Sequence, residues 1–532
     1  MSGNLLKSLA TVSGMTMLSR VLGFVRQVLI AGVIGAGGNP VADAFWAAFR
    51  LPNMFRRLFA EGAFQAAFVP LFQGKLIGED KAAARQFAEE VMAGLVFILT
   101  ALIVVVEIFA PLFVYLLASG FSDDPEKFRL TELYLRIMFP YLACMSIVGL
   151  LSGILNSLDR FLAYAGAPLF LNVCQIAAIV LYADAEIHAT GEALAWATMA
   201  SGLLQLALLV WGAHRQGYLL KWRLPRWTPG VSRLLKLGTP GFISAGAIQI
   251  NLIVGTNIAS QEPGAVSWLM NADQLYQLPL SVVGIALGAV LLPMLSRRVK
   301  EGDEKGAAHA LNRSMELSAV LTLPAAAAFI VMAAPICDAL FRGLATDALG
   351  LFGGRASAFT EEDVRMTGMA LALFGAGLPA FVWHKVFSPA YYAREDTRTP
   401  MNYALVSIAI NIVLSLALFP LFGFIAVAFA TSFASWVQIA MLGWTLRKRG
   451  IFSPDPRLFS RSPRIVAATL GMAGFLWLSL KYTDALAPIF FDRSWIVVIL
   501  ISTAGLAVYG LLSLALGALR LSDYKAYARP RA

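Results

Sequence analysis

Five arginines stand in apolar stretches near the start of the chain, where a charged side chain is costly. They are Arg20, Arg26, Arg50, Arg56 and Arg57. An arginine at the centre of a membrane-spanning helix costs about 2.5–3.5 kcal/mol on insertion scales. Asp43 and Glu61 are the only acidic residues between positions 14 and 72, so the arginines cannot all be paired locally.

Surplus guanidinium groups in an apolar region predict a site for an anion. Guanidinium is planar, always charged and matches phosphate oxygens with a fork of donors. We therefore expect Arg20, Arg26 and Arg56 to face a watery cavity that takes a phosphorylated substrate. A transporter of organic cations is expected to carry surplus carboxylates instead.

Structural explanations compete with this one for the remaining arginines. Arg57 and Glu61 are four residues apart, the spacing of an ion pair on one helix face. Arg50 has a stem long enough to carry its charge to a membrane surface. We therefore treat Arg57 and Glu61 as structural or gating candidates.

Gly23 lies between Arg20 and Arg26. Six residues correspond to about 120° around an ideal helix, so the two arginines do not share one face. A bend at Gly23 brings them closer, which makes this glycine a further structural or gating candidate.

The composition is that of a membrane protein. Of 532 residues, 58% are hydrophobic and 14% are charged, whereas soluble domains have about 25% charged residues. We interpret the net charge of +10 as the basic bias of cytoplasmic loops rather than as a nucleic-acid surface. The three cysteines lie in apolar runs without the spacing of a metal site.

About 20 mostly apolar residues are needed to span a bilayer as a helix. Fourteen segments meet this requirement, which predicts an all-α polytopic membrane protein. They are 8–34, 41–72, 90–118, 131–157, 161–183, 190–213, 232–259, 266–296, 312–341, 364–392, 400–420, 424–446, 463–482 and 493–519.

Lysine and arginine set the predicted orientation. They gather in the loops 215–233 and 297–305, whereas the loop 184–192 has none. The positive-inside rule then places the basic loops and both chain ends in the cytoplasm. This describes a multi-pass membrane protein with both ends on the cytoplasmic side.

A weak internal repeat divides the chain. Ala42-Asp43 followed by Leu51-Pro52 is echoed by Ala272-Asp273 followed by Leu278-Pro279. We therefore predict two pseudo-symmetric six-helix lobes, 1–230 and 231–450. Two C-terminal helices and a cytoplasmic tail occupy 451–532.

The stretch Leu51–Phe64, LPNMFRRLFAEGAF, resembles the MurJ (MviN) lipid II flippases of the multidrug/oligosaccharidyl-lipid/polysaccharide exporter superfamily. The segment Ser19–Arg26, SRVLGFVR, is similar to the same family. The resemblance implies fourteen helices, with the last two lining a lipid groove. It also implies a transporter without chemical turnover. By alternating access it moves the undecaprenyl-diphosphate-linked peptidoglycan precursor from the inner to the outer leaflet.

The resemblance assigns substrate-binding roles to particular residues. Arg20, Arg26 and Arg56 match the family's cavity arginines, and Asp43 matches an associated acid. In the second half, Asp273 and Gln274 stand where the family has Asp-Arg, so one cavity arginine is missing. Two further glutamines, Gln27 and Gln277, replace acidic residues of some members.

We expect no cofactor and no metal, and the sequence leaves coupling to the membrane potential or to an ion open. The expected partners are the lipid-linked anionic substrate, membrane lipid and cell-wall synthesis proteins, with the chain a monomer. Four other functions stay open as hypotheses. They are a flippase for another polyprenyl-linked oligosaccharide, a drug/cation antiporter of the same superfamily, a scaffold for division proteins, and a membrane glycosyltransferase. The glycosyltransferase needs a sizeable outer loop, and the predicted outer loops are short.

Overall fold

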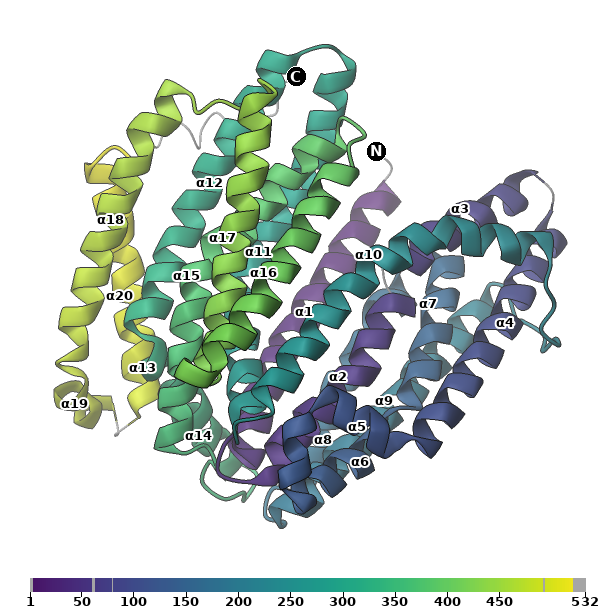
Figure 1. Cartoon of the computed structure of the whole chain (residues 1–532), viewed down its shortest axis with the longest axis horizontal. Coiled ribbons are helices and arrows are strands. Elements are labelled where there is room, and N and C mark those ends of the chain that lie inside the picture. Colours follow the sequence, from purple (N-terminus) through teal and green to yellow (C-terminus); the bar gives the residue numbers. More distant parts are fainter. Residues whose placement is uncertain (1–2, 60–62, 79, 491–492, 520–532) are drawn as a thin grey trace. The chain divides into compact units, whose positions relative to one another are not determined.

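The computed structural model describes residues 3–59, 63–78, 80–490 and 493–519, and this part of the chain is helical without strands (Figure 1). In hydrocarbon every backbone polar group needs an internal partner, which a helix supplies within one segment. The chain forms two compact units. Unit 1 contains the described residues up to Ser267 together with Ala345–Phe359, and unit 2 contains Trp268–Leu344 and the described residues from Thr360 onward.

Unit 1 is built from the first ten helices, a 3-10 turn and one short later helix. They are α1 (Gly3–Ile34), α2 (Pro40–Phe59), α3 (Ala63–Gly78), α4 (Lys81–Ile108), α5 (Ala110–Leu117), η1 (Ser119–Asp123), α6 (Pro125–Met138), α7 (Tyr141–Ser157), α8 (Leu162–Leu181), α9 (Ile187–Arg215), α10 (Pro229–Ala259) and α14 (Ala345–Gly350). Helix α1 packs along α8, and α7 packs along α9.

Unit 2 contains the later helices, beginning after the first turn of α11. They are α11 (Ala265–Lys300), α12 (Glu304–Val331), α13 (Ala333–Cys337), the π-helix η2 (Asp338–Leu344), α15 (Glu361–Tyr392), α16 (Arg398–Phe422), α17 (Ile425–Lys448), α18 (Pro456–Leu480), α19 (Thr483–Leu486), η3 (Ala487–Phe490) and α20 (Ser494–Ala515). Helices α16 and α17 lie side by side, as do α18 and α20 (Figure 1).

The all-helical membrane fold is confirmed. Within the described residues, 11 helices are long and apolar enough to cross a membrane, and they coincide with predicted spans. The other three predicted spans fall on α2 with α3, on α10 and on α11. The count of fourteen spans stays a prediction.

The predicted span 41–72 falls on α2 and α3, and residues 60–62 between them lie outside the described part of the chain. Helix α2 ends at Phe59 and α3 begins at Ala63. The last turn of α2 carries Arg56 and Arg57.

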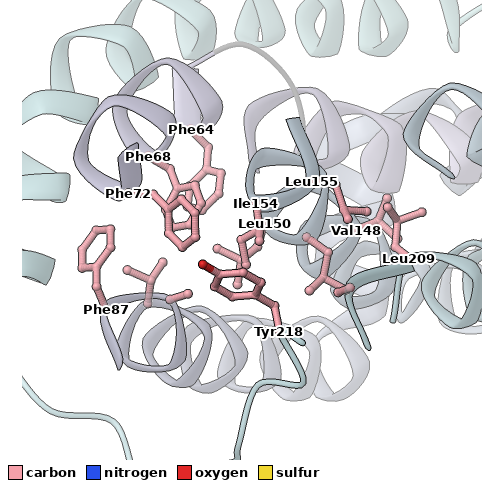
Figure 2. Close-up of a cluster of buried hydrophobic side chains, with 14 of the residues drawn as sticks. Phe64, Phe68, Phe72, Phe87, Val148, Leu150, Ile154, Leu155, Leu209 and Tyr218 are labelled. Carbon is pink, nitrogen blue, oxygen red and sulfur yellow. The ribbon is translucent and has the colours of Figure 1, made fainter. Parts of the chain in front are cut away.

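Stacked aromatic rings hold α3 against its neighbours in unit 1 (Figure 2). The ring of Phe68 lies 5.6 Å from those of Phe64 and Phe72 and 5.7 Å from that of Phe87 on α4. Tyr218, from the segment after α9, meets Phe72 edge-on at 5.8 Å. Rings at such separations attract each other beyond their area burial, so this cluster fixes the helix that follows α2.

A buried charge cluster joins α12 to α18 in unit 2. Glu316 accepts hydrogen bonds from Arg461, at 2.5 Å, and from Arg313 and Arg457. Arg313 also pairs with Asp455, which caps the N-terminus of α18 by accepting from the backbone N–H of Leu458. This network ties the C-terminal helix pair to the rest of unit 2.

The turn between α15 and α16 is fixed by a second, more exposed ion pair. Arg449, just after α17, donates to Asp396 at 2.6 Å, and Thr399 donates to the same carboxylate through its backbone N–H and its hydroxyl. Partial burial alone would raise the pKa of Asp396, but these hydrogen bonds lower it to about 2.

Candidate anion-binding site

Arg26 is the predicted site residue with the most unusual surroundings. It lies on α1, and its Nε atom is buried without a hydrogen-bond partner among the described residues. It interacts electrostatically with Arg56 on α2 and with Tyr141 on α7, both in unit 1. The structure therefore brings together two of the three arginines that the sequence predicts, and their like charges repel each other.

Arg56 is positioned by its own helix. Its Nε and Nη2 atoms donate to Oδ1 of Asn53 at 3.1 and 3.0 Å. Asn53 stands one turn earlier on α2 and is neutral. This contact therefore orients the guanidinium of Arg56.

Arg20 is partly exposed on α1, and the described residues offer it neither a hydrogen bond nor an ion pair. Near it, Asn172 of α8 donates to the backbone carbonyl of Ser19 at 2.9 Å. An added Cβ at Gly23 would lie 3.6 Å from the Asn172 side chain, which is ordinary contact. Helix α1 runs without interruption through Gly23, so a gating role for this glycine stays a prediction.

Asp43 is placed differently from the arginines. It is completely buried, about 20 Å along α2 from Arg56 at the helical rise of 1.5 Å per residue. It pairs with Lys127 of α6 at 3.2 Å and accepts from the N–H of Gly264 at 2.7 Å. Ser267 donates to it through its N–H at 3.0 Å and its hydroxyl at 2.7 Å. These four donors use the capacity of the carboxylate within unit 1.

Sequence reasoning missed these partners of Asp43. Lys127 lies 84 residues away and Ser267 lies 224 residues away along the chain. The only sequence signal was the lone acid itself in an apolar stretch, which demands a partner without saying which one.

The remaining predicted residues of the first half have separate surroundings. Arg57 is exposed, and Glu61 lies outside the described residues, so their ion pair stays a prediction. Arg50 donates from Nη1 to the carbonyl of Leu252 on α10 at 3.1 Å, a contact that the sequence did not suggest.

Asp273 and Gln274 lie on the part of α11 that belongs to unit 2. Asp273 accepts a hydrogen bond from the side chain of Gln277, one turn later on the same helix. A glutamine at 277 therefore serves as a donor to the acid, which a carboxylate there could not do. Gln274 is partly buried and carries no charge.

Residues 30–495 match the family model described as "Lipid II flippase MurJ". The chain belongs to the MurJ family. A probable lipid II flippase MurJ from Rhizobium meliloti is 47% identical over 484 residues, 90% of this chain and 87% of the relative. The lipid II flippase MurJ of Burkholderia cenocepacia is 35% identical over 90% of this chain and 91% of its own length.

Solved structures agree with membership of the MurJ family. A lipid II flippase MurJ in an inward closed conformation matches with a TM-score of 0.77 and 25% identity, over 97% of this chain and 99% of that one. An inward-facing multidrug transporter of the MATE family, in the MOP superfamily, matches with a TM-score of 0.66 at 15% identity. The latter shows a shared fold alone. MurJ proteins are transporters, so the family assignment also places this chain outside the enzymes.

Proposed function

We propose that this chain moves lipid II, the undecaprenyl-diphosphate-linked peptidoglycan precursor, from the inner to the outer leaflet of the bacterial cytoplasmic membrane by alternating access. Family membership supports the substrate class. The single observation that carries the chemistry is Arg26, whose buried Nε has no acceptor among the described residues and whose charge interacts unfavourably with that of Arg56.

A bound diphosphate satisfies both features of this arrangement. Its oxygens accept the hydrogen bond that the Arg26 Nε does not make, and its negative charge offsets the repulsion between Arg26 and Arg56. Hydrogen bonds to charged groups contribute about 1.5–3 kcal/mol each. Arg20, on the same helix and without an ion pair among the described residues, extends the basic surface.

Gln274 is neutral, so it supplies no guanidinium for an anion. We therefore expect the diphosphate to depend mainly on α1 and α2. Asp43 and Asp273 then act on substrate binding only indirectly. Asp43 holds the first turn of α2, and Asp273 orients its part of α11.

Complementation of a strain depleted of its own lipid II flippase tests this proposal. Arg26→Ala, Arg20→Ala and Arg56→Ala should each abolish growth while the protein still accumulates in the membrane. Arg26→Lys should be partly active because a point charge replaces a fork of donors. Gln274→Ala is the matched control and should be mild. A dead, well-expressed Gln274→Ala beside a healthy Arg26→Ala would place the substrate elsewhere.

A flippase for another polyprenyl-linked oligosaccharide would use the same diphosphate chemistry. Mass spectrometry of lipids that co-purify with the chain separates the two, because a muropeptide attached to the diphosphate identifies lipid II. A different glycan on the same carrier would support the alternative instead. Surplus guanidinium on α1 and α2 argues against an exporter of organic cations.

The transport cycle also needs an orientation and a division into moving parts. We propose that both chain ends are cytoplasmic and that 1–230, 231–450 and 451–532 are the two lobes and the C-terminal helix pair. A monomer suffices for this cycle. Cell-wall synthesis enzymes are the proposed consumers of the delivered precursor.

A further inference from the structure

A cavity of about 700 Å³ lies within unit 1, where α7 ends, α8 begins and α9 ends. We call it the α8–α9 groove. Met15 of α1 also lines it, so the groove adjoins the helix that carries Arg20 and Arg26. None of the three arginines of the proposed lipid II site lines it, which makes it a separate feature of the molecule.

The walls of the groove suit acyl chains. Leu169, Phe170 and Val173 of α8 face Leu208 of α9 across it, and Val173 is 50% exposed. Gly166 lines the same space, and a Cβ added there would meet nothing within 4 Å. The groove is therefore open at Gly166 and apolar along its length.

The rim of the groove is basic. Arg160, in the turn before α8, and Arg215, at the end of α9, are both exposed and make no ion pair within the described residues. The guanidinium of Arg215 lies 4.1 Å from the ring centroid of Trp211. Asp159 is the one carboxylate among the lining residues, which leaves the rim with a net positive charge.

The apolar walls and the basic rim together complement the two ends of an anionic phospholipid. Trp is enriched at membrane–water interfaces, so Trp211 marks the level of the head groups. Basic pockets at this level, above apolar clefts between helices, attract anionic head groups. Two guanidinium groups can form forked hydrogen bonds with the phosphate of any phospholipid, but they repel the cationic end of a choline head group, so an anionic lipid is favoured.

We propose that the α8–α9 groove binds an anionic glycerophospholipid, with its phosphate at Arg160 and Arg215 and an acyl chain along Phe170 and Gly166. The bound lipid lies against α1 through Met15. Its occupancy therefore bears on the helix that carries the transport arginines. The inference rests on the groove alone and does not depend on which lipid the chain transports.

Native mass spectrometry of the full-length chain, titrated with phosphatidylglycerol or phosphatidylcholine of equal chain length, tests the proposal. Phosphatidylglycerol should bind more tightly. Arg160→Gln and Arg215→Gln should each weaken it about tenfold, since a charge-assisted hydrogen bond contributes that factor or more. Arg226→Gln, which removes an exposed charge outside the groove, is the matched control and should leave binding unchanged.

A variant that fills the groove provides an independent second test. Gly166→Leu places a side chain in the open space and should weaken phosphatidylglycerol binding although every arginine remains. Gly510→Leu, on α20 in unit 2, adds the same atoms where a Cβ also meets nothing within 4 Å, and it should have no effect. Both variants should fold, because neither glycine has a positive φ.

Three results would overturn the proposal. One is equal affinity for phosphatidylcholine, and another is an equal loss of binding in Arg226→Gln and in the Arg160 and Arg215 variants. The third is displacement of phosphatidylglycerol from the wild-type chain by undecaprenyl phosphate, with that displacement lost in Gly166→Leu. It would assign the groove to the polyprenyl chain of a substrate.

Discussion

Removing the charge of Glu316 should destabilise unit 2 more than removing a charge from any exposed ion pair of that unit. The side chain of Glu316 is 8% exposed and that of its partner Arg461 is 7% exposed. Removing one partner of a buried pair costs about 3–5 kcal/mol, because the other charge is left in a poorly solvated place. Glu316 also serves Arg313 and Arg457, so we expect Glu316→Gln to lie at the upper end.

Glu301, in the turn directly after α11, provides the matched control. It pairs with Arg297 on α11, and the side chains of Arg297 and Glu301 are 79% and 53% exposed. Exposed pairs four residues apart on a helix contribute about 0.3–0.5 kcal/mol. Glu301→Gln should therefore change stability by about a tenth of the effect of Glu316→Gln.

Unfolding of the purified chain in mixed detergent and SDS micelles measures these free energies. The double variant Glu316→Gln with Arg461→Met should be less destabilised than the sum of the two single variants, by about 0.5–3 kcal/mol. The second change removes the guanidinium that the first leaves without this carboxylate. If Glu316→Gln and Glu301→Gln unfold alike, the cluster does not hold α18 to α12.

Further predictions concern pH, folding and orientation. The pKa of Asp396 is about 2 in the folded chain, below its ordinary value. The contribution of Asp396 to the free energy of unfolding is therefore complete above about pH 4 and is lost as the pH falls toward 2. Asp396→Asn should flatten that part of an acid-unfolding curve. Asp43→Asn should lower the yield of folded protein, and adding Lys127→Met should restore part of it, since Lys127 is buried beside the carboxylate; no rescue would mean that Asp43 acts on substrate instead. In a cysteine-free background, Glu186→Cys should react with an impermeant thiol reagent in intact cells and Arg226→Cys should not; the reverse would contradict the proposed orientation.

Local composition already determined the class of the protein. With 58% hydrophobic and 14% charged residues, the chain can fold only with lipid as part of its solvent, and lipid admits helices whose backbone groups pair internally. The arginines at 20, 26 and 56 stood out for the same reason, because the cost of charge in an apolar segment depends on that segment alone. The family could also be recognised from short motifs in α1 and α2, and the match over residues 30–495 confirms it.

The partners of each charged side chain were decided only by the tertiary structure. Arg26 interacts electrostatically with Arg56 and Tyr141, Asp43 binds Lys127 and Ser267, and Glu316 binds arginines from two helices. Apart from the pair of Arg313 and Glu316 on α12, these interactions join positions far apart in the chain, and the periodicity of one helix says nothing of which other helix packs against it. The sequence therefore showed which charges needed partners, and helix packing selected a carboxylate for Lys127, three arginines for Glu316 and, for the Nε of Arg26, no acceptor within the described chain.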